Sequence, residues 1–160
     1  GGAGGIGTIA IQVAKSLGAY VATTATGQGI DYVKKLGADE VIDYKDKNFW
    51  EILSDYDAVF DMVGGETFEK SFKVLKKGGV IVSMVSQDEK KLADQYQVRA
   101  ISQFTKVNKE YLNMLTDFIE KGSVRPHIDK IFSFDKMKDA FEYKEKEDVL
   151  GKIVINIHSG

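Results

Sequence analysis

The first residues of the 160-residue sequence have the types and spacing needed to bind a phosphate. Gly2, Gly4 and Gly7 fit the pattern G-x-G-x-x-G. In that pattern one glycine permits a tight turn, one lets the backbone approach a pyrophosphate, and one lets the following helix pack closely. The backbone N–H groups of Gly5 and Ile6 would begin that helix and hold the phosphates, aided by its dipole. A glycine-rich turn at a chain end would look the same, so the surrounding elements must decide.

Helical and strand patterns alternate along the chain. Helices are expected at residues 6–17, 30–36, 49–53, 66–75, 88–96, 108–120 and 134–143, and strands at 20–24, 40–44, 58–62, 80–85, 98–104 and 152–157. Near-continuous apolar strands between helices indicate a parallel sheet covered on both faces. The sequence therefore predicts an α/β fold with a doubly wound Rossmann-type sheet, and this context favours a dinucleotide site at residues 2–7.

In that fold a central strand precedes the glycine loop, whereas this sequence starts at the loop without an initiator Met. We therefore expect a fragment that lacks the first, central strand of its sheet. Its length fits one domain, a dinucleotide-binding domain over residues 1–160.

Composition excludes several classes of function. Lys+Arg 22 against Asp+Glu 24 gives a net charge of −2, so no nucleic-acid partner is expected. No apolar stretch is long enough to span a membrane. The absence of cysteine excludes disulfides, zinc–thiolate sites and thiol nucleophiles, and fits a cytoplasmic location.

The end of the first expected strand, with the residues just after it, bears on the choice of cofactor. An NAD-binding domain usually carries an acid about 20 residues past the loop. Residues 23–27 contain no acid, and the next acidic residue is Asp31. A carboxylate would repel a 2′-phosphate, whereas threonine hydroxyls can donate to one, which favours NADP(H). Alternatively, these small polar residues merely cap the strand and tolerate either cofactor. Tyr44 and Lys45 could flank the same phosphate.

No convincing catalytic set emerges from the residues. No tyrosine is followed four residues later by lysine, which excludes the short-chain dehydrogenase pattern. His127 and His158 have no partner at metal-ligand spacing, so no metal site is expected. Asp61, at the end of an expected strand, could be catalytic or could cap the loop that follows. We assign no catalytic residue.

The order of these features resembles the cofactor-binding half of the medium-chain dehydrogenase/reductase superfamily, specifically its zinc-independent quinone oxidoreductase branch. The matching segments are residues 1–7 (GGAGGIG), 36–44 (LGADEVIDY), 56–65 (YDAVFDMVGG), 77–82 (KGGVIV), 122–126 (GSVRP) and 151–155 (GKIVI).

The resemblance implies an NADPH-dependent oxidoreductase that passes hydride to quinones or other α,β-unsaturated carbonyls without a metal. It also implies three groups of cofactor contacts: Ala3, Gly4, Gly5 and Ile6 at the pyrophosphate, Thr24, Ala25, Thr26 and Tyr44 at the adenosine 2′-phosphate, and Val63, Met84, Val85 and Phe104 along the nicotinamide. Two departures matter. Gly29 stands where the family often has a lysine, and the N-terminal substrate domain, toward which residues from about 122 would return, is absent.

Two further expectations concern assembly and class. The strand expected at 98–104 alternates in character and suits a half-buried sheet edge, and the family dimerises through this strand, so we expect a homodimer. The alternative to an enzyme is a non-catalytic NADP(H)-binding sensor or scaffold module.

Overall fold

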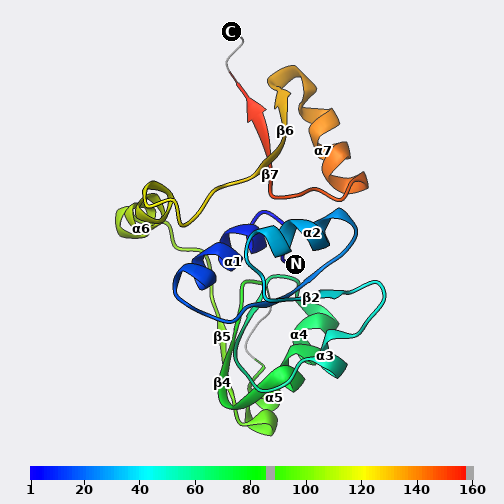
Figure 1. The fold of residues 1–160 in the computed structure, drawn as a ribbon, viewed down its shortest axis with the longest axis vertical. Helices are drawn as coiled ribbons and strands as arrows, with labels where there is room; N and C mark the ends of the chain where they lie inside the picture. The colour runs from blue at the N-terminus through cyan, green and yellow to red at the C-terminus, as the bar shows by residue number, and fades with distance from the viewer. Residues whose placement is uncertain (86–88, 158–160) are drawn as a thin grey trace. The chain divides into compact units, whose positions relative to one another are not determined.

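The computed structural model describes residues 1–85 and 89–157. The chain divides into two compact units, Gly1–Lys47 with Lys109–Gly160, and Asn48–Asn108. Figure 1 labels most of their elements. Each unit is described by itself.

The first unit begins with alternating helices and strands. They are α1 (Gly7–Ser16), β1 (Ala22–Ala25), α2 (Gln28–Lys35) and β2 (Glu40–Asp43). β1 and β2 pair in parallel, with Ala22 opposite Glu40 and Ala25 opposite Asp43. Their shared core contains Ile11 of α1 and Val33 of α2. All four elements were predicted, with ends displaced by one or two residues.

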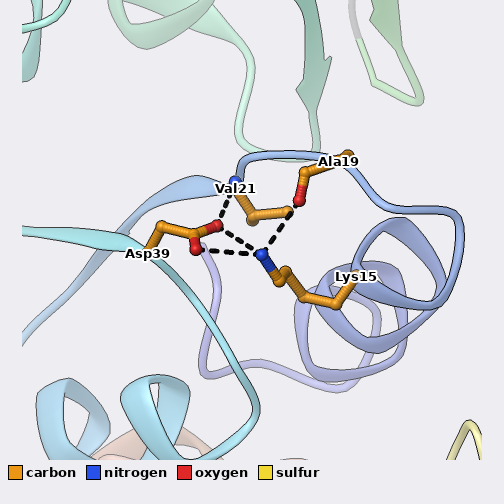
Figure 2. A network of polar contacts seen from close by, with 4 residues as sticks. All are labelled: Lys15, Ala19, Val21 and Asp39. Atoms are coloured by element: carbon orange, nitrogen blue, oxygen red, sulfur yellow. Dashed lines mark hydrogen bonds and ion pairs between the residues drawn. The ribbon is translucent and has the colours of Figure 1, made fainter.

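A salt bridge lies next to the first residues of β1 and β2, as Figure 2 shows. Lys15 Nζ contacts both carboxylate oxygens of Asp39, at 2.9 and 2.7 Å, and also donates to Ala19 O. The Val21 N–H donates to Asp39 Oδ2 at 2.7 Å. The end of α1 is thereby tied to the residues just before β1 and β2. The hydrogen bonds from Lys15 and Val21 hold the pKa of Asp39 below its usual value.

The same unit also contains the last part of the chain. Its elements are α6 (Lys109–Glu120), β6 (Ile128–Ser133), η2 (Phe134–Lys136), α7 (Met137–Lys146) and β7 (Lys152–Asn156). β6 and β7 form a parallel pair with α7 alongside (Figure 1). The sequence pattern did not predict β6. Helix α6 was predicted, and its apolar face, which includes Leu112, Leu115 and Ile119, is exposed.

The second unit is a three-stranded parallel sheet with its own helices. Its elements are α3 (Phe49–Ile52), β3 (Tyr56–Asp61), α4 (Gly65–Ser71), η1 (Phe72–Val74), β4 (Leu75–Ser83), α5 (Lys90–Tyr96) and β5 (Arg99–Ser102). The strand order is β3-β4-β5. Phe68, Phe72 and Ile81 are buried at its centre. The prediction that a helix extends to Leu75 and a strand starts at Val80 was wrong, because β4 already begins at Leu75.

The strand orders of these two sheets match a doubly wound sheet without its first strand. A Rossmann sheet has the order 3-2-1-4-5-6. Removal of strand 1 leaves a pair, 3-2, and a trio, 4-5-6. The observed sheets, β1-β2 and β3-β4-β5, have these connections when β1 is counted as the second strand. The predicted α/β, Rossmann-type fold class is therefore confirmed.

Candidate functional site

The glycines of the loop before α1 play two different structural roles. A Cβ on Gly2 would overlap Thr23 Oγ1 of β1, and one on Gly7 would lie 2.7 Å from Gly2 Cα. Both positions therefore require glycine for close packing of loop, strand and helix. By contrast, the closest atom to a Cβ on Gly4 would be Gly1 O, at 3.6 Å. Gly4 thus leaves open space beside the backbone, as the approach of a pyrophosphate demands.

The backbone N–H groups of Gly5 and Ile6 are also suited to binding a phosphate. The Thr8 N–H donates to Gly4 O at 3.1 Å, and the Ala10 N–H donates to Ile6 O at 2.9 Å. Within residues 1–85 and 89–157, the N–H groups of Gly5 and Ile6 have no hydrogen-bond partner. Free N–H groups at the start of a ten-residue helix suit an anion.

The strand at the end of the chain holds this loop and brings a charge to it. The Gly151 N–H donates to Ala3 O at 2.9 Å, and Gly4 and Gly151 form a parallel bridge. Lys152 follows, and its Nζ lies 3.0 Å from the position of a Cβ on Gly5. An ammonium group beside free N–H donors strengthens an anion site. Sequence reasoning missed Lys152, because nothing local to it signals that β7 returns to the loop.

The residues predicted at the adenosine end lie in the same unit as the loop. The Gly2 N–H donates to Thr24 O at 2.9 Å, which joins the loop to β1. Ala25 and Thr26 are buried as whole residues, at 2% and 8% exposure. The Tyr44 N–H donates to Ala25 O at 3.4 Å, and the Tyr44 ring is exposed. Backbone hydrogen bonds therefore connect the loop to β1 and β1 to the residue after β2.

Gly29 stands where the resemblance leads us to expect a lysine. A Cβ at this position would lie 2.9 Å from Ala3 Cβ and 3.6 Å from Ala25 Cβ. A side chain at Gly29 would therefore require Ala3 or α2 to shift.

The residues predicted along the nicotinamide lie in the second unit. Val63, Met84 and Val85, and Phe104 follow the carboxyl ends of β3, β4 and β5 respectively. Since the three strands are parallel, their carboxyl ends lie at the same end of the sheet. Val63, Val85 and Phe104 are each largely exposed.

Asp61 connects the carboxyl ends of β3 and β4 through hydrogen bonds. Its carboxylate is buried, at 4% exposure. Oδ1 accepts the N–H groups of Val63 and Gly64, at 3.1 and 3.0 Å, and Oδ2 accepts the Ser83 hydroxyl at 2.6 Å. Ser83 Oγ in turn accepts the Val85 N–H at 3.2 Å. Of the two interpretations of Asp61, the geometry favours a cap over a proton-transferring group.

Other groups offer less chemistry. The His127 ring lies against Tyr32, with centroids 4.8 Å apart, and burial raises the pKa of Tyr32. His158 lies outside the described residues. Among those that are described, no three His, Cys, Asp or Glu side chains gather to hold a metal ion. The described helices also include none with the length and apolarity to cross a membrane.

The fold and the glycine loop define a Rossmann-type nucleotide-binding architecture, and comparisons with known proteins identify its family. A family model described as zinc-binding dehydrogenase matches residues 36–155. The chain belongs to this family, and its matches correspond to the C-terminal half of the medium-chain dehydrogenase/reductase superfamily. Within residues 1–85 and 89–157, the side chains offer no set of ligands that fits a zinc ion.

Individual relatives agree with this assignment. The chain is 40% identical to 2-methylene-furan-3-one reductase of Solanum lycopersicum, over 98% of this chain and 39% of that protein. It is 35% identical to the NADPH-dependent alkenal/one oxidoreductase, chloroplastic, of Arabidopsis thaliana, over 96% and 38%. The quinone oxidoreductase structure from Coxiella burnetii superposes with a TM-score of 0.88 at 34% identity, over 98% and 51%. The chain thus spans about half or less of these relatives' lengths.

Proposed function

We propose that the chain is the cofactor-binding part of an NADPH-dependent oxidoreductase that transfers hydride to quinones or other α,β-unsaturated carbonyls without zinc. The observation that carries the proposal is the glycine loop: open backbone at Gly4, unpaired N–H groups at Gly5 and Ile6 within the described residues, and the Lys152 ammonium beside them. Relatives named as an enone reductase, an alkenal/one oxidoreductase and a quinone oxidoreductase support the reaction class.

In this proposal NADP(H) uses all three groups of residues predicted from the sequence. The pyrophosphate meets the backbone of Ala3–Ile6, and Lys152 adds a positive charge. The 2′-phosphate meets Thr24, Ala25, Thr26 and Tyr44. The apolar side chains at 63, 84–85 and 104 line the nicotinamide. The printed name of the Arabidopsis thaliana relative, an NADPH-dependent enzyme, supports this cofactor.

The proposal also covers the chain's place in a longer protein. Residues 1–160 serve as one dinucleotide-binding domain, and residues from about 122 return toward a substrate domain outside this sequence. The exposed face of α6 and the exposed Ile128 and Ile131 of β6 are consistent with such a neighbour. A cytoplasmic location remains a prediction, and one relative is named as chloroplastic.

Turnover by the full-length protein tests this function. NADPH oxidation is followed by absorbance with a quinone or an enone as acceptor, with and without a metal chelator. We expect turnover with at least one acceptor and no effect of the chelator. NADPH binding without turnover on either acceptor would favour the sensor or scaffold alternative. The 160-residue chain alone, which contains no substrate domain, should show no turnover above a heat-treated control.

We further propose a homodimer joined through β5. This strand is an edge of the three-stranded sheet, and Val98 and Ala100 pack on the core while Ile101 is 41% exposed. The Gln103 N–H donates inward to Ser83 O. Since N–H directions alternate along a strand, that of Ala100 points outward, where a second chain would pair.

The outward direction at Ala100 selects the variant that tests the dimer. Ala100→Pro removes an edge donor without removing an inward bond, and should shift the full-length protein toward monomer in light scattering. Ala100→Val keeps the donor and is the matched control. A dimer mass that survives Ala100→Pro would refute this interface.

A further inference from the structure

A carboxylate from the end of the chain lies at the turn between β1 and α2. Asp148 Oδ2 is 3.7 Å from the position that a Cβ on Gly27 would occupy. Asp148 is exposed, and within the described residues its carboxylate has no ion pair. Two hydrogen bonds hold the backbone just after Asp148. The Leu150 N–H donates to Asp129 Oδ1 at 3.4 Å, and the Gly151 N–H donates to Ala3 O at 2.9 Å. The fold therefore delivers this charge to the turn.

The turn is where a dinucleotide-binding fold receives the adenosine ribose. In NAD-binding domains an acidic residue at this place, about 20 residues past the glycine loop, accepts a hydrogen bond from the ribose 2′-hydroxyl. Residues 23–27 contain no acid. Asp148 brings a carboxylate to the same turn from a distant part of the sequence.

No cation from α2 offsets that carboxylate at the turn. Gly29, two residues after Gly27 and the second residue of α2, has little space for a side chain, because a Cβ would lie 2.9 Å from Ala3 Cβ. Residues 23–27 lack an acid and carry threonine hydroxyls, but these two local features describe only part of the surroundings of the turn. The carboxylate of Asp148 acts in the opposite direction from the threonine hydroxyls.

We propose that Asp148 is a specificity-determining residue that weakens binding of the 2′-phosphate and accepts a hydrogen bond from an unmodified 2′-hydroxyl. The proposal rests on the function proposed above and deepens it. This one side chain reduces the preference of the site for NADPH over NADH. A 2′-phosphate carries a charge of about −1.5 to −2. Repulsion between this phosphate and one exposed carboxylate beside the turn is expected to lower affinity about fivefold at moderate ionic strength.

Adenosine fragments of the two cofactors test the proposal without requiring turnover. Adenosine 2′,5′-bisphosphate and 5′-AMP differ only in the 2′-phosphate, and each is titrated into the full-length protein by calorimetry. Asp148→Asn should tighten the bisphosphate about fivefold and leave 5′-AMP unchanged or slightly weaker. High salt should reduce the gain. Asp117→Asn, which removes an exposed carboxylate from α6, is the matched control for net charge and should change neither affinity.

The outcomes separate this proposal from the proposed function. If wild-type protein binds neither fragment, the dinucleotide site itself is wrong, and the role of Asp148 falls with it. If both fragments bind and Asp148→Asn shifts their affinity ratio no more than Asp117→Asn does, the role of Asp148 is refuted while the site stands. An equal loss of affinity for both fragments would show that Asp148 merely supports the turn, and would also overturn the proposal.

Discussion

Replacement of Asp61 should destabilise the second unit in a graded way. Asp61→Ala leaves three donors without their acceptor: the N–H groups of Val63 and Gly64 and the hydroxyl of Ser83. Asp61→Asn keeps one carbonyl oxygen for the two N–H groups, and its amide can donate to Ser83 Oγ. The two variants therefore differ in hydrogen bonding much more than in size.

The magnitude follows from which donors are buried. An unsatisfied buried donor costs about 1–3 kcal/mol. The bond from Gly64 and the bond from Ser83 are buried, whereas the bond from Val63 is only partly so and water can replace it. We expect Asp61→Ala to lower the free energy of unfolding by about 3–5 kcal/mol, and Asp61→Asn by about 1–2 kcal/mol.

Urea unfolding of the chain measures both values. Trp50, the one tryptophan of the sequence, belongs to the same unit and reports its unfolding by fluorescence. A cycle with Ser83→Ala isolates the bond between the two side chains, and its coupling energy should be about 1 kcal/mol or more. The reasoning fails if Asp61→Ala costs under about 1 kcal/mol, or if Ala and Asn are equally destabilising.

Three other variants probe the first unit. Asp39→Asn should be less stable than wild type at neutral pH, and the difference should vanish in acid: the depressed pKa of Asp39 stabilises the fold above the unfolded value of about 3.9, and this contribution is lost as pH falls through the folded-state pKa. Urea midpoints against pH check this, and a difference that persists in acid would contradict it. Gly7→Ala should lower stability by about 1–3 kcal/mol and weaken NADPH binding, because its Cβ would lie 2.7 Å from Gly2 Cα. Denaturation and titration measure the two effects, and wild-type behaviour in both would refute the packing role of Gly7. Gly29→Lys should weaken NADPH binding despite its added charge, and tighter binding in a titration would show that Ala3 can give way.

The sequence predicted most elements because their signals are local. Glycines at 18 and 37 follow the ends of α1 and α2, and short apolar runs define β1, β2 and β3. Such periodicity and punctuation survive in one sequence because each helix or strand must bury a face. This local information suffices for the order of elements and hence for the fold class.

Two errors came from pairings between distant residues. β4 starts at Leu75 because Leu75 pairs with Tyr56 across a register shift, and Lys76 forms an ion pair with Asp57. The run of lysines and glycines at 76–79 resembles a turn when read alone. β6 likewise lacks a clear two-residue alternation and is defined by pairing with β7. Strand formation depends on such partners more than on intrinsic preference.

The candidate site divides in the same way. The glycine loop and residues 24–26 could be found because the motif and its following strand are close in sequence. Lys152 beside Gly5, and Asp148 beside Gly27, could not be found, since only the return of the chain into β7 brings them to the loop and the turn. The charges around the site are therefore tertiary, whereas its backbone is local.

The amide resonances of Gly5 and Ile6 test the central claim most directly. In isotope-labelled full-length protein, NADPH should move both amide proton resonances downfield, because each N–H gains a charged acceptor. The amide of Ala10, whose N–H already donates to Ile6 O, serves as the internal reference and should move less. Saturable NADPH binding that leaves the Gly5 and Ile6 resonances in place would contradict the assignment of the pyrophosphate to this loop.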